Sequence, residues 1–386
     1  MPRILFENLE TTPYKIDFDA VTESGRHRLW FEFDRRVECS TAAIASAMST
    51  LCGKKYNEIS FDFEVPVNIL EKISAFASAE VRSKPAAASY SRIPDSVLPV
   101  LSFSGGFDSL AAYRLLNNQA NLVSLDFGGW FRREAEFFST FDTLVVKTNI
   151  RRVPSQQDSF ARNHWTFMAV GAILTSEYFG GRYHVFGSIL GDTFARRPSK
   201  RKIAPLEMVG LENLPVTEGI TELGTAKVLA QTDPALIRGS LESLAGATDR
   251  KRFLKVLLSH VGAKAAGVSV DVPDLIETWD NTIRFSSSYT TAMTCMYLLA
   301  KGEEDLIAPL YETVPSSAKE AVGGMSLDFM LKANWDYYTF LTEDFAPSLA
   351  ARLTELGFRP YSEVDWREAH AVRSYLNDVF DYPKIC

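Results

Sequence analysis

Alternating hydrophobic and polar residues in the first part of the chain predict short strands. In residues 27–34, HRLWFEFD, every second position from Leu29 to Phe33 is apolar, which is the period of two expected for a half-buried strand. Residues 58–65, EISFDFEV, repeat this pattern. Between them, residues 40–51, STAAIASAMSTL, begin with a serine suited to N-capping and continue with helix-forming alanines. Together these elements predict an N-terminal α+β domain over residues 1–94.

The pattern changes after residues 81–96, VRSKPAAASYSRIPDS, which have no apolar period and predict a linker with a domain boundary near residue 95. After it, continuous apolar runs alternate with helical ones, in the order VLPVLSF, DSLAAYRLL, ANLVSLDF, FRREAEFFSTF and TLVVKTN. Apolar strands separated by helices of about ten residues predict a parallel sheet covered on both faces. A long helix over residues 160–178 and a strand within residues 182–189 extend this doubly wound α/β domain, which we place at residues 95–215.

Helical spacing dominates the remainder of the chain, as in KRFLKVLLSH and TAMTCMYLLA, and predicts a mostly helical C-terminal region over residues 216–386. The apolar segment 165–174 is too short to cross a bilayer, and the first ten residues carry three charges and offer no apolar signal-peptide core. Membrane insertion and secretion are therefore not expected.

The charge and the cysteine content of the chain exclude further classes of partner and site. The 41 Lys and Arg residues against 48 Asp and Glu residues give a net charge of −7, which disfavours bulk nucleic-acid binding unless basic residues gather on one face. The cysteines, Cys39, Cys52, Cys295 and Cys386, are scattered and include no Cys-x-x-Cys pair for zinc or a redox disulfide. These features favour a reduced cytoplasm.

The segment 102–113, SFSGGFDSLAAY, places two glycines between an apolar run and a helical pattern. Backbone amides in such a loop point toward one place, and the following helix adds the positive end of its dipole, so phosphate oxygens are the natural ligand. Gly105 and Gly106 would let an anion approach the main chain, and Ser104 and Ser109 could donate hydroxyls. The loop matches neither the P-loop with its lysine nor the G-x-G-x-x-G fingerprint. The alternative is a serine-rich turn whose Asp108 caps a helix.

The same residues, LSFSGGFDSLAA, resemble the SGGxDS signature of the PP-loop ATP pyrophosphatases, and all five fixed positions match. This adenine nucleotide alpha hydrolase-like superfamily contains asparagine synthetase, GMP synthetase, NAD synthetase and 7-cyano-7-deazaguanine synthase. The resemblance covers residues 99–215 and leaves the flanking regions unassigned. It implies a doubly wound parallel sheet, ATP and Mg²⁺ as cofactors, and adenylation of a substrate with release of pyrophosphate.

The resemblance also implies roles for individual residues. It assigns nucleotide binding to Ser102, Phe103, Ser104, Gly105, Gly106, Asp108, Ser109, Asp126 and Arg197. Asp108 is the candidate catalytic residue that holds the metal or its water, and helix capping is the alternative for its side chain. Asp126, at the end of the strand VSLDF, would lie close to the nucleoside or else cap the helix that follows.

A basic loop provides the second group of candidates. In residues 190–202, LGDTFARRPSKRK, five basic residues crowd into seven positions at the carboxyl end of a predicted strand, where open parallel sheets bind ligands. By the resemblance, Asp192 and Arg196 are candidate catalytic residues, and Arg196 or Arg197 would neutralise the leaving pyrophosphate. For Lys200, Arg201 and Lys202 a solvated loop is the favoured interpretation.

Four further polar positions have plainer interpretations. Glu222 lies next to Thr221 before a helical stretch, and ordinary capping is favoured over a role in the active site. Glu222 and Lys227 are five residues apart and do not share a helix face well, so no mutual pair is expected. His164 and His184 are interpreted as satisfied interior or edge residues.

Among the resembling enzymes, 7-cyano-7-deazaguanine synthase is the nearest in its single-chain style, but its zinc-binding cysteines are missing here, as is a glutaminase domain. We therefore expect an AMP-forming ligase that adenylates a carboxylate or amide oxygen on a small molecule or a protein terminus. Ammonia or another amine from outside then displaces AMP. An enzyme that uses a sulfur donor and a catalytically silent nucleotide-binding regulator are the alternatives, and a homodimer is left open.

Overall fold

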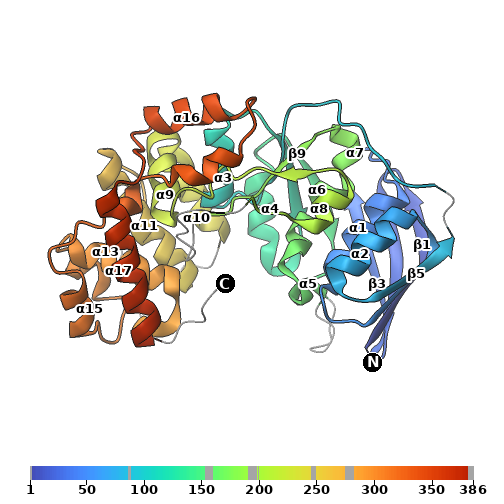
Figure 1. The fold of residues 1–386 in the computed structure, drawn as a ribbon, viewed down its shortest axis with the longest axis horizontal. Helices are drawn as coiled ribbons and strands as arrows, with labels where there is room; N and C mark the ends of the chain where they lie inside the picture. The colour runs from blue at the N-terminus through green and yellow to red at the C-terminus, as the bar shows by residue number, and fades with distance from the viewer. Residues whose placement is uncertain are drawn as a thin grey trace. The chain divides into compact units, whose positions relative to one another are not determined.

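The computed structural model describes residues 2–85, 88–152, 160–189, 198, 200–244, 249–273 and 282–380 (Figure 1). The chain divides into two compact units. The first, called the sheet unit, consists of Met1–Ser104, Gln119–Phe186 and Arg201–Leu214. The second, called the helical unit, consists of Gly105–Asn118, Gly187–Lys200 and Pro215–Cys386.

The sheet unit is built on ten strands in the order β10-β9-β6-β7-β8-β3-β2-β1-β4-β5. Their bounds are β1 Arg3–Thr12, β2 Lys15–Thr22, β3 Gly25–Phe33, β4 Glu58–Val65, β5 Glu80–Pro85, β6 Val100–Ser102, β7 Asn121–Asp126, β8 Thr143–Thr148, β9 Tyr183–Val185 and β10 Glu212–Asn213. Neighbouring strands are parallel except in the pairs β1–β2, β2–β3 and β3–β8. The predicted α/β class with a largely parallel sheet is thus confirmed.

The helices of the sheet unit are short apart from α1 and α2. Their bounds are α1 Thr41–Cys52, α2 Val67–Ala77, α4 Arg132–Phe138, α5 Phe160–Asn163, α6 Val170–Leu174, α7 Ser176–Phe179 and α8 Ala204–Met208, with 3-10 turns η1 Gly129–Phe131 and η2 Trp165–Ala169. Helix α1 contacts β4, α2, α6 and α8 (Figure 1). Because α1 consists mainly of small residues, all but its first are buried, and the helix lies in the centre of the apolar core.

Strand β6 lies between β7 and β9, so the strand order reverses on its two sides. Chain order along the parallel part is 5-4-1-2-3, which is compatible with a doubly wound sheet. Such a reversal is a topological switch point, and ligands of open α/β sheets bind outside the carboxyl ends of the strands there. The segment that follows β6 is the SGGFDS loop.

One antiparallel seam joins the N-terminal strands to the parallel part of the sheet. Strand β3 pairs with β8 in the register Phe31↔Thr148, Glu32↔Lys147 and Phe33↔Val146. The regions predicted as separate domains on either side of residue 95 therefore share one sheet, and residue 95 itself falls within the sheet unit.

Two predicted elements were wrong in part. The predicted linker 81–96 begins with strand β5, which pairs with β4 at the edge of the sheet. The charged residues of β5 give it no apolar period, so the sequence pattern did not predict a strand there. Lys84 and Pro85 are nevertheless typical of protected edge strands. The predicted helix 160–178 is broken into α5, η2, α6 and α7, because His164 has an extended backbone and its ring accepts a hydrogen bond from the Thr166 amide.

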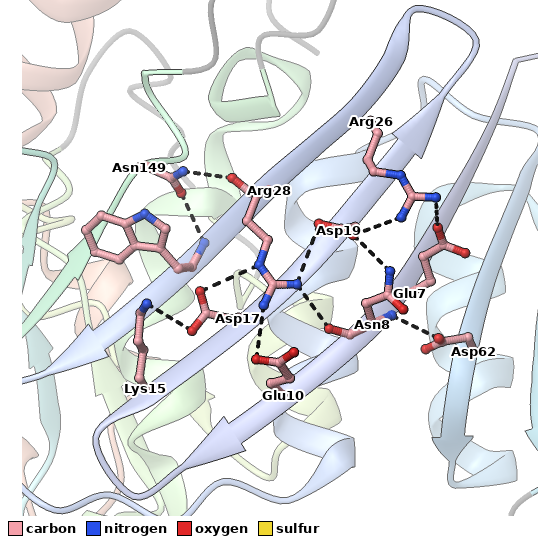
Figure 2. A network of polar contacts seen from close by, with 11 residues as sticks. Glu7, Asn8, Glu10, Lys15, Asp17, Asp19, Arg26, Arg28, Asp62 and Asn149 are labelled. Carbon is pink, nitrogen blue, oxygen red and sulfur yellow. Dashed lines mark hydrogen bonds and ion pairs between the residues drawn. The ribbon is translucent and has the colours of Figure 1, made fainter.

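A charged network covers one face of the antiparallel strands (Figure 2). We call it the strand network, and its members are Glu7, Asn8, Glu10, Lys15, Asp17, Asp19, Arg26, Arg28 and Asp62. Arg28 lies between three carboxylates, at 3.3 Å from Glu10, 3.8 Å from Asp17 and 3.5 Å from Asp19. Its side chain is 40% exposed, so water screens these pairs.

The helical unit contains the helices after residue 216, as the sequence predicted, and also α3 Phe107–Leu115, which the sequence analysis had placed in the α/β domain. Their bounds are α9 Glu222–Thr232, α10 Pro234–Leu244, α11 Arg250–Ala266, α13 Tyr289–Ala300, α14 Glu304–Ile307, α15 Ser316–Ala321, α16 Ala346–Glu355 and α17 Glu363–Phe380. Helix α9 packs against both α3 and α11, which places it in the centre of this group. Along the described residues, no helix combines the length and apolar character needed to span a membrane.

Candidate functional site

The SGGFDS loop connects β6 to α3 through residues 103–106, as the sequence predicted. Gly105 has φ of 73°, a left-handed conformation that residues with a side chain rarely adopt, so the loop requires a glycine there. Gly106 precedes the first turn of α3 with an extended backbone. The chain passes from the sheet unit to the helical unit between Ser104 and Gly105. A strand that ends in a glycine turn at a helix N-terminus is the local structure that phosphate binding requires.

Within the sheet unit, Ser102 and Phe103 are fixed by their neighbours. The Ser102 hydroxyl lies 2.8 Å from Nε2 of His184, so the bond crosses the switch point from β6 to β9. The Phe103 amide donates to the carbonyl of Val123, and the Phe103 carbonyl accepts from the Ser124 hydroxyl. Ser104 is half-buried and follows directly. These contacts hold the first part of the loop rigidly on the sheet.

His184 is fully buried, and burial lowers its pKa to about 3, so the ring is neutral at physiological pH. Nδ1 has no hydrogen-bond partner within the described part of the chain. A buried N–H without an acceptor is rarer than a buried bare acceptor, which favours the tautomer with the proton on Nε2. In that tautomer Nε2 donates to Ser102, and the hydroxyl hydrogen of Ser102 is available to another acceptor.

Within the helical unit, Asp108 belongs to a buried charged group that we call the Lys255 cluster: Asp108, Glu222, Thr225 and Lys255. The Thr225 hydroxyl donates to Asp108 Oδ1 over 2.8 Å. Lys255 Nζ lies 3.6 Å from the same oxygen and 3.4 Å from Glu222 Oε1. Only 8% of the Lys255 side chain is exposed, against 27% for Asp108 and 30% for Glu222. The carboxylates thus form the accessible side of the cluster.

The electrostatics of the Lys255 cluster favour a charged ammonium. Burial alone would lower the pKa of Lys255, but the charges of Asp108 and Glu222 outweigh burial and raise it. One ammonium then serves two carboxylates. With both acids ionised, the cluster retains one unit of negative charge beside the start of α3.

Within the helical unit, the segment that contains Gly187 approaches the first turn of α3 closely, next to Ser109. The Ser109 hydroxyl donates to the Gly106 carbonyl over 3.0 Å. A Cβ atom on Gly187, which follows β9, would lie 2.5 Å from the Ser109 amide nitrogen. Only glycine fits at position 187, so this segment lies against the N-terminus of α3. Ser240 adds a hydrogen bond of 2.8 Å to the Gly105 carbonyl.

The remaining predicted residues are placed differently. Asp126 ends β7 and accepts the Gly128 amide over 2.7 Å, which is a contact within the turn, and the helix that follows, α4, has no side-chain cap. Asp192, Arg196 and Arg197 lie outside the described residues. Lys200, Arg201 and Lys202 are exposed, and Arg201 lies over the Trp165 ring.

The cysteines within the described residues are poor nucleophiles. Burial raises the pKa of Cys39 to about 12, with a smaller contribution from Glu177, and it raises the pKa of Cys52 and Cys295 further. Cys386 lies outside the described residues. No group of three or more His, Cys, Asp or Glu side chains in the described ranges is arranged to hold a metal ion.

Sequence reasoning missed Lys255, Thr225 and Ser240. A signal for Lys255 was present, because it interrupts the apolar run FLKVLL on a helix. Glu222 was noted beside Thr221, and Thr221 does cap α9 through the Gly224 amide. As expected, Glu222 does not pair with Lys227, which donates instead to the Gly357 carbonyl.

Comparisons with protein-family models, curated proteins and solved structures find no match to this chain. The SGGFDS loop, its resemblance to the PP-loop signature and the groups around it are therefore what indicates a function for this chain.

Proposed function

We propose that this protein is an ATP-dependent enzyme of the PP-loop type. It adenylates a carboxylate or amide oxygen with release of pyrophosphate, and a nitrogen nucleophile then displaces AMP from the adenylated carbon. One observation carries the proposal: the SGGFDS sequence occurs at the switch point of a parallel sheet, with a left-handed Gly105 and a helix directly after it.

The residues around the loop suit the chemistry. Loop amides and the dipole of α3 stabilise the negative charge that develops on the leaving pyrophosphate. The hydroxyl of Ser102, oriented by His184, supplies a further donor. Within the sheet unit, the contact with His184 holds the Ser102 hydroxyl in place before ATP arrives, so this donor needs little reorganisation.

The donor set fits Mg²⁺, which binds proteins through one or two carboxylates and completes its shell with phosphate oxygens and water. Asp108 would hold the ion, and Glu222 is the second carboxylate of the same cluster. When bound with ATP, Mg²⁺ supplies charge neutralisation at the phosphates. The exposure of both carboxylates beside a buried Lys255 is the observation that supports this fit.

The nucleophile is nitrogen in our proposal. Persulfide chemistry needs an accessible thiolate, and the described cysteines Cys39, Cys52 and Cys295 are buried or half-buried and protonated at neutral pH. Water-soluble ammonia or a small amine needs no such group. A sulfur-transferring enzyme would have to depend on Cys386, so serine at that position tests the alternative.

The proposal is tested by product analysis. The protein is incubated with α-labelled ATP, Mg²⁺, ammonium and a metabolite extract that supplies the acceptor, and AMP and pyrophosphate are expected. In Asp108→Asn, AMP formation should fall by about a hundredfold or more because charge stabilisation in the transition state is lost. Asp62→Asn, which removes a carboxylate from the strand network, is the matched control and should retain activity.

Three results would contradict the proposal. ADP as product would indicate a different cleavage, and unchanged turnover in Asp108→Asn would remove this residue from the mechanism. Tight ATP binding without AMP formation under any condition would favour the alternative function, a catalytically silent nucleotide-binding regulator. Circular dichroism of both variants shows whether each one is folded.

A further inference from the structure

Arg151, in the turn after β8, is surrounded by aromatic rings of the sheet unit. Its guanidinium carbon lies 4.3 Å from the ring centroid of Phe127, 4.5 Å from that of Phe131 and 5.0 Å from that of Phe167. We call these four residues the Arg151 platform. Three rings around one cation fix the guanidinium in place.

The cation of the Arg151 platform has no carboxylate partner among the described residues. Its one hydrogen-bond contact is with the sulfur of Met168 at 3.9 Å, a weak acceptor. Burial lowers the pKa of Arg151, and the charge of Glu134 compensates only in part. In contrast, Arg182 of the same unit also lies over an aromatic ring, that of Tyr183, but it pairs with Glu212 at 3.0 Å.

The loop under the Arg151 platform is built to hold its shape. The Asp126 carboxylate accepts the Gly128 amide, and Arg152 Nε donates to the Phe127 carbonyl over 3.0 Å. A Cβ atom on Gly128 would lie 1.4 Å from the Arg152 guanidinium, so only glycine allows this contact. Both arginines therefore hold the loop that follows β7, and the Arg151 guanidinium still keeps N–H donors for a ligand.

Trp130 is the exposed part of this loop. It immediately precedes Phe131 in η1 and is 97% exposed, which is exceptional for the largest apolar side chain. Gly129 before it has φ of 57° and open space around its Cβ position. Phe131, the next residue, packs against Arg151, so the Trp130 ring is tethered one residue from the platform and can cover a planar ligand that the cation binds.

The location favours a ligand site. Strands β7 and β8 are parallel neighbours, so the loop bearing Trp130 and the turn bearing Arg151 leave the sheet at the same carboxyl edge. Ligands of open parallel sheets bind at that edge. Strand β8 lies two positions from β6 in the sheet, a separation of about 10 Å.

We propose that the Arg151 platform binds the carboxylate or phosphate group of a small planar molecule, with Trp130 packed against its ring. A guanidinium presents parallel N–H donors that match both oxyanions. Resting on the proposed function, this molecule is the acceptor substrate, and the bound anion is a second acidic group besides the one that is adenylated.

Binding to the full-length protein is measured by isothermal titration without ATP. Phenyl phosphate and benzoate are the probes for the two oxyanions, inorganic phosphate tests the need for a ring, and benzamide is the uncharged comparison. Saturable binding of at least one aromatic anion is expected, and benzamide should not bind. Whichever of phenyl phosphate and benzoate binds more tightly identifies the oxyanion.

The variants separate binding from packing. Arg151→Met, which keeps a long apolar side chain, should weaken the anion about tenfold or more, and Arg151→Lys should weaken it less. Trp130→Ala should weaken the binding of phenyl phosphate about fivefold and leave the binding of inorganic phosphate unchanged. Arg182→Met is the matched control, since it removes a ring-stacked arginine that already has a carboxylate partner, and it should change binding less than twofold.

Absence of saturable binding by the wild type, or equal weakening in Arg151→Met and Arg182→Met, would overturn the inference. Its failure is distinguishable from failure of the proposed function. Anion binding without AMP formation would support the anion site and contradict the proposed ligase function. AMP formation without anion binding would support the ligase function and contradict the anion site.

Discussion

The strand network and the Lys255 cluster both place cations between carboxylates, but they do so in opposite surroundings. Arg28 of the strand network is 40% exposed, whereas Lys255 is 8% exposed. The Arg28 guanidinium and the Glu10 carboxylate remain partly hydrated, so their pairing is worth little. The Lys255 ammonium is largely dehydrated, so Asp108 and Glu222 must compensate for the lost hydration.

This difference bears on why each group exists. A network such as that in Figure 2 keeps the antiparallel face soluble and tolerates exchange of its members. A buried ion pair adds little net stability compared with apolar residues of similar volume, and yet removal of one partner is strongly destabilising. The Lys255 cluster is thus poorly explained by stability and better explained by a role at the start of α3.

Removal of the central cation should give the largest difference between the two regions. Lys255→Met leaves Asp108 and Glu222 without their shared ammonium and should lower the free energy of unfolding by about 3 kcal/mol. Arg28→Met should lower it by less than about 1 kcal/mol. Urea unfolding at pH 7 measures both values.

A second variant sharpens this test. Lys255→Met combined with Asp108→Asn and Glu222→Gln removes all three charges and should recover most of the lost stability. Similar losses in Lys255→Met and Arg28→Met would show that the two regions do not differ in the way proposed here.

The two regions should also respond to opposite ends of the pH scale. Burial raises the pKa of Asp19, but hydrogen bonds from Asn8 and Arg26 and the charge of Arg28 outweigh it and lower the pKa. Its contribution is therefore present above the unfolded pKa of about 3.9 and is lost as pH falls through the lower folded value. For Lys255 the folded pKa is raised, so its contribution is present below the unfolded value of about 10.4 and is lost as pH rises through the folded one.

Unfolding free energies across the pH range check this prediction. The difference between wild type and Asp19→Asn, about 1 kcal/mol at neutral pH, should shrink below pH 4 and stay constant in alkali because arginine remains protonated. The difference between wild type and Lys255→Met should shrink in alkali. A Lys255→Met difference that is constant above pH 11 would be inconsistent with a cation held by Asp108 and Glu222.

Salt should produce the smallest effect. Screening at 1 M NaCl acts within about 3 Å, so the coupling energy of the Arg28–Glu10 pair, expected at about 0.5 kcal/mol, should fall by half or more. The coupling between Lys255 and Glu222 should change little because the pair is largely shielded from solvent. Double-mutant cycles at low and high salt give both numbers, and a salt-sensitive Lys255–Glu222 pair would place it in the same class as the strand network.

The local sequence pattern predicted elements formed by adjacent residues, but it did not predict contacts between residues that are distant in the chain. The SGGFDS loop was found from adjacent residues, because strand, glycine turn and helix follow one another along the chain. Lys255 joins Asp108 from a distant helix, and no local period announces that contact. The break at His164 depends on a hydrogen bond between its own ring and a backbone amide, which competes with helix formation in a way that apolar spacing does not reveal.

The seam between β3 and β8 also has a consequence for shortened versions of the chain. Strand β8, TLVVKT, pairs with β7 on one side and with β3 on the other, so both of its backbone edges are occupied. A chain that began at residue 95 would expose one of these edges, and an uncovered apolar edge recruits strands from other molecules. The N-terminal strands therefore protect the part of the sheet that carries the SGGFDS loop against aggregation.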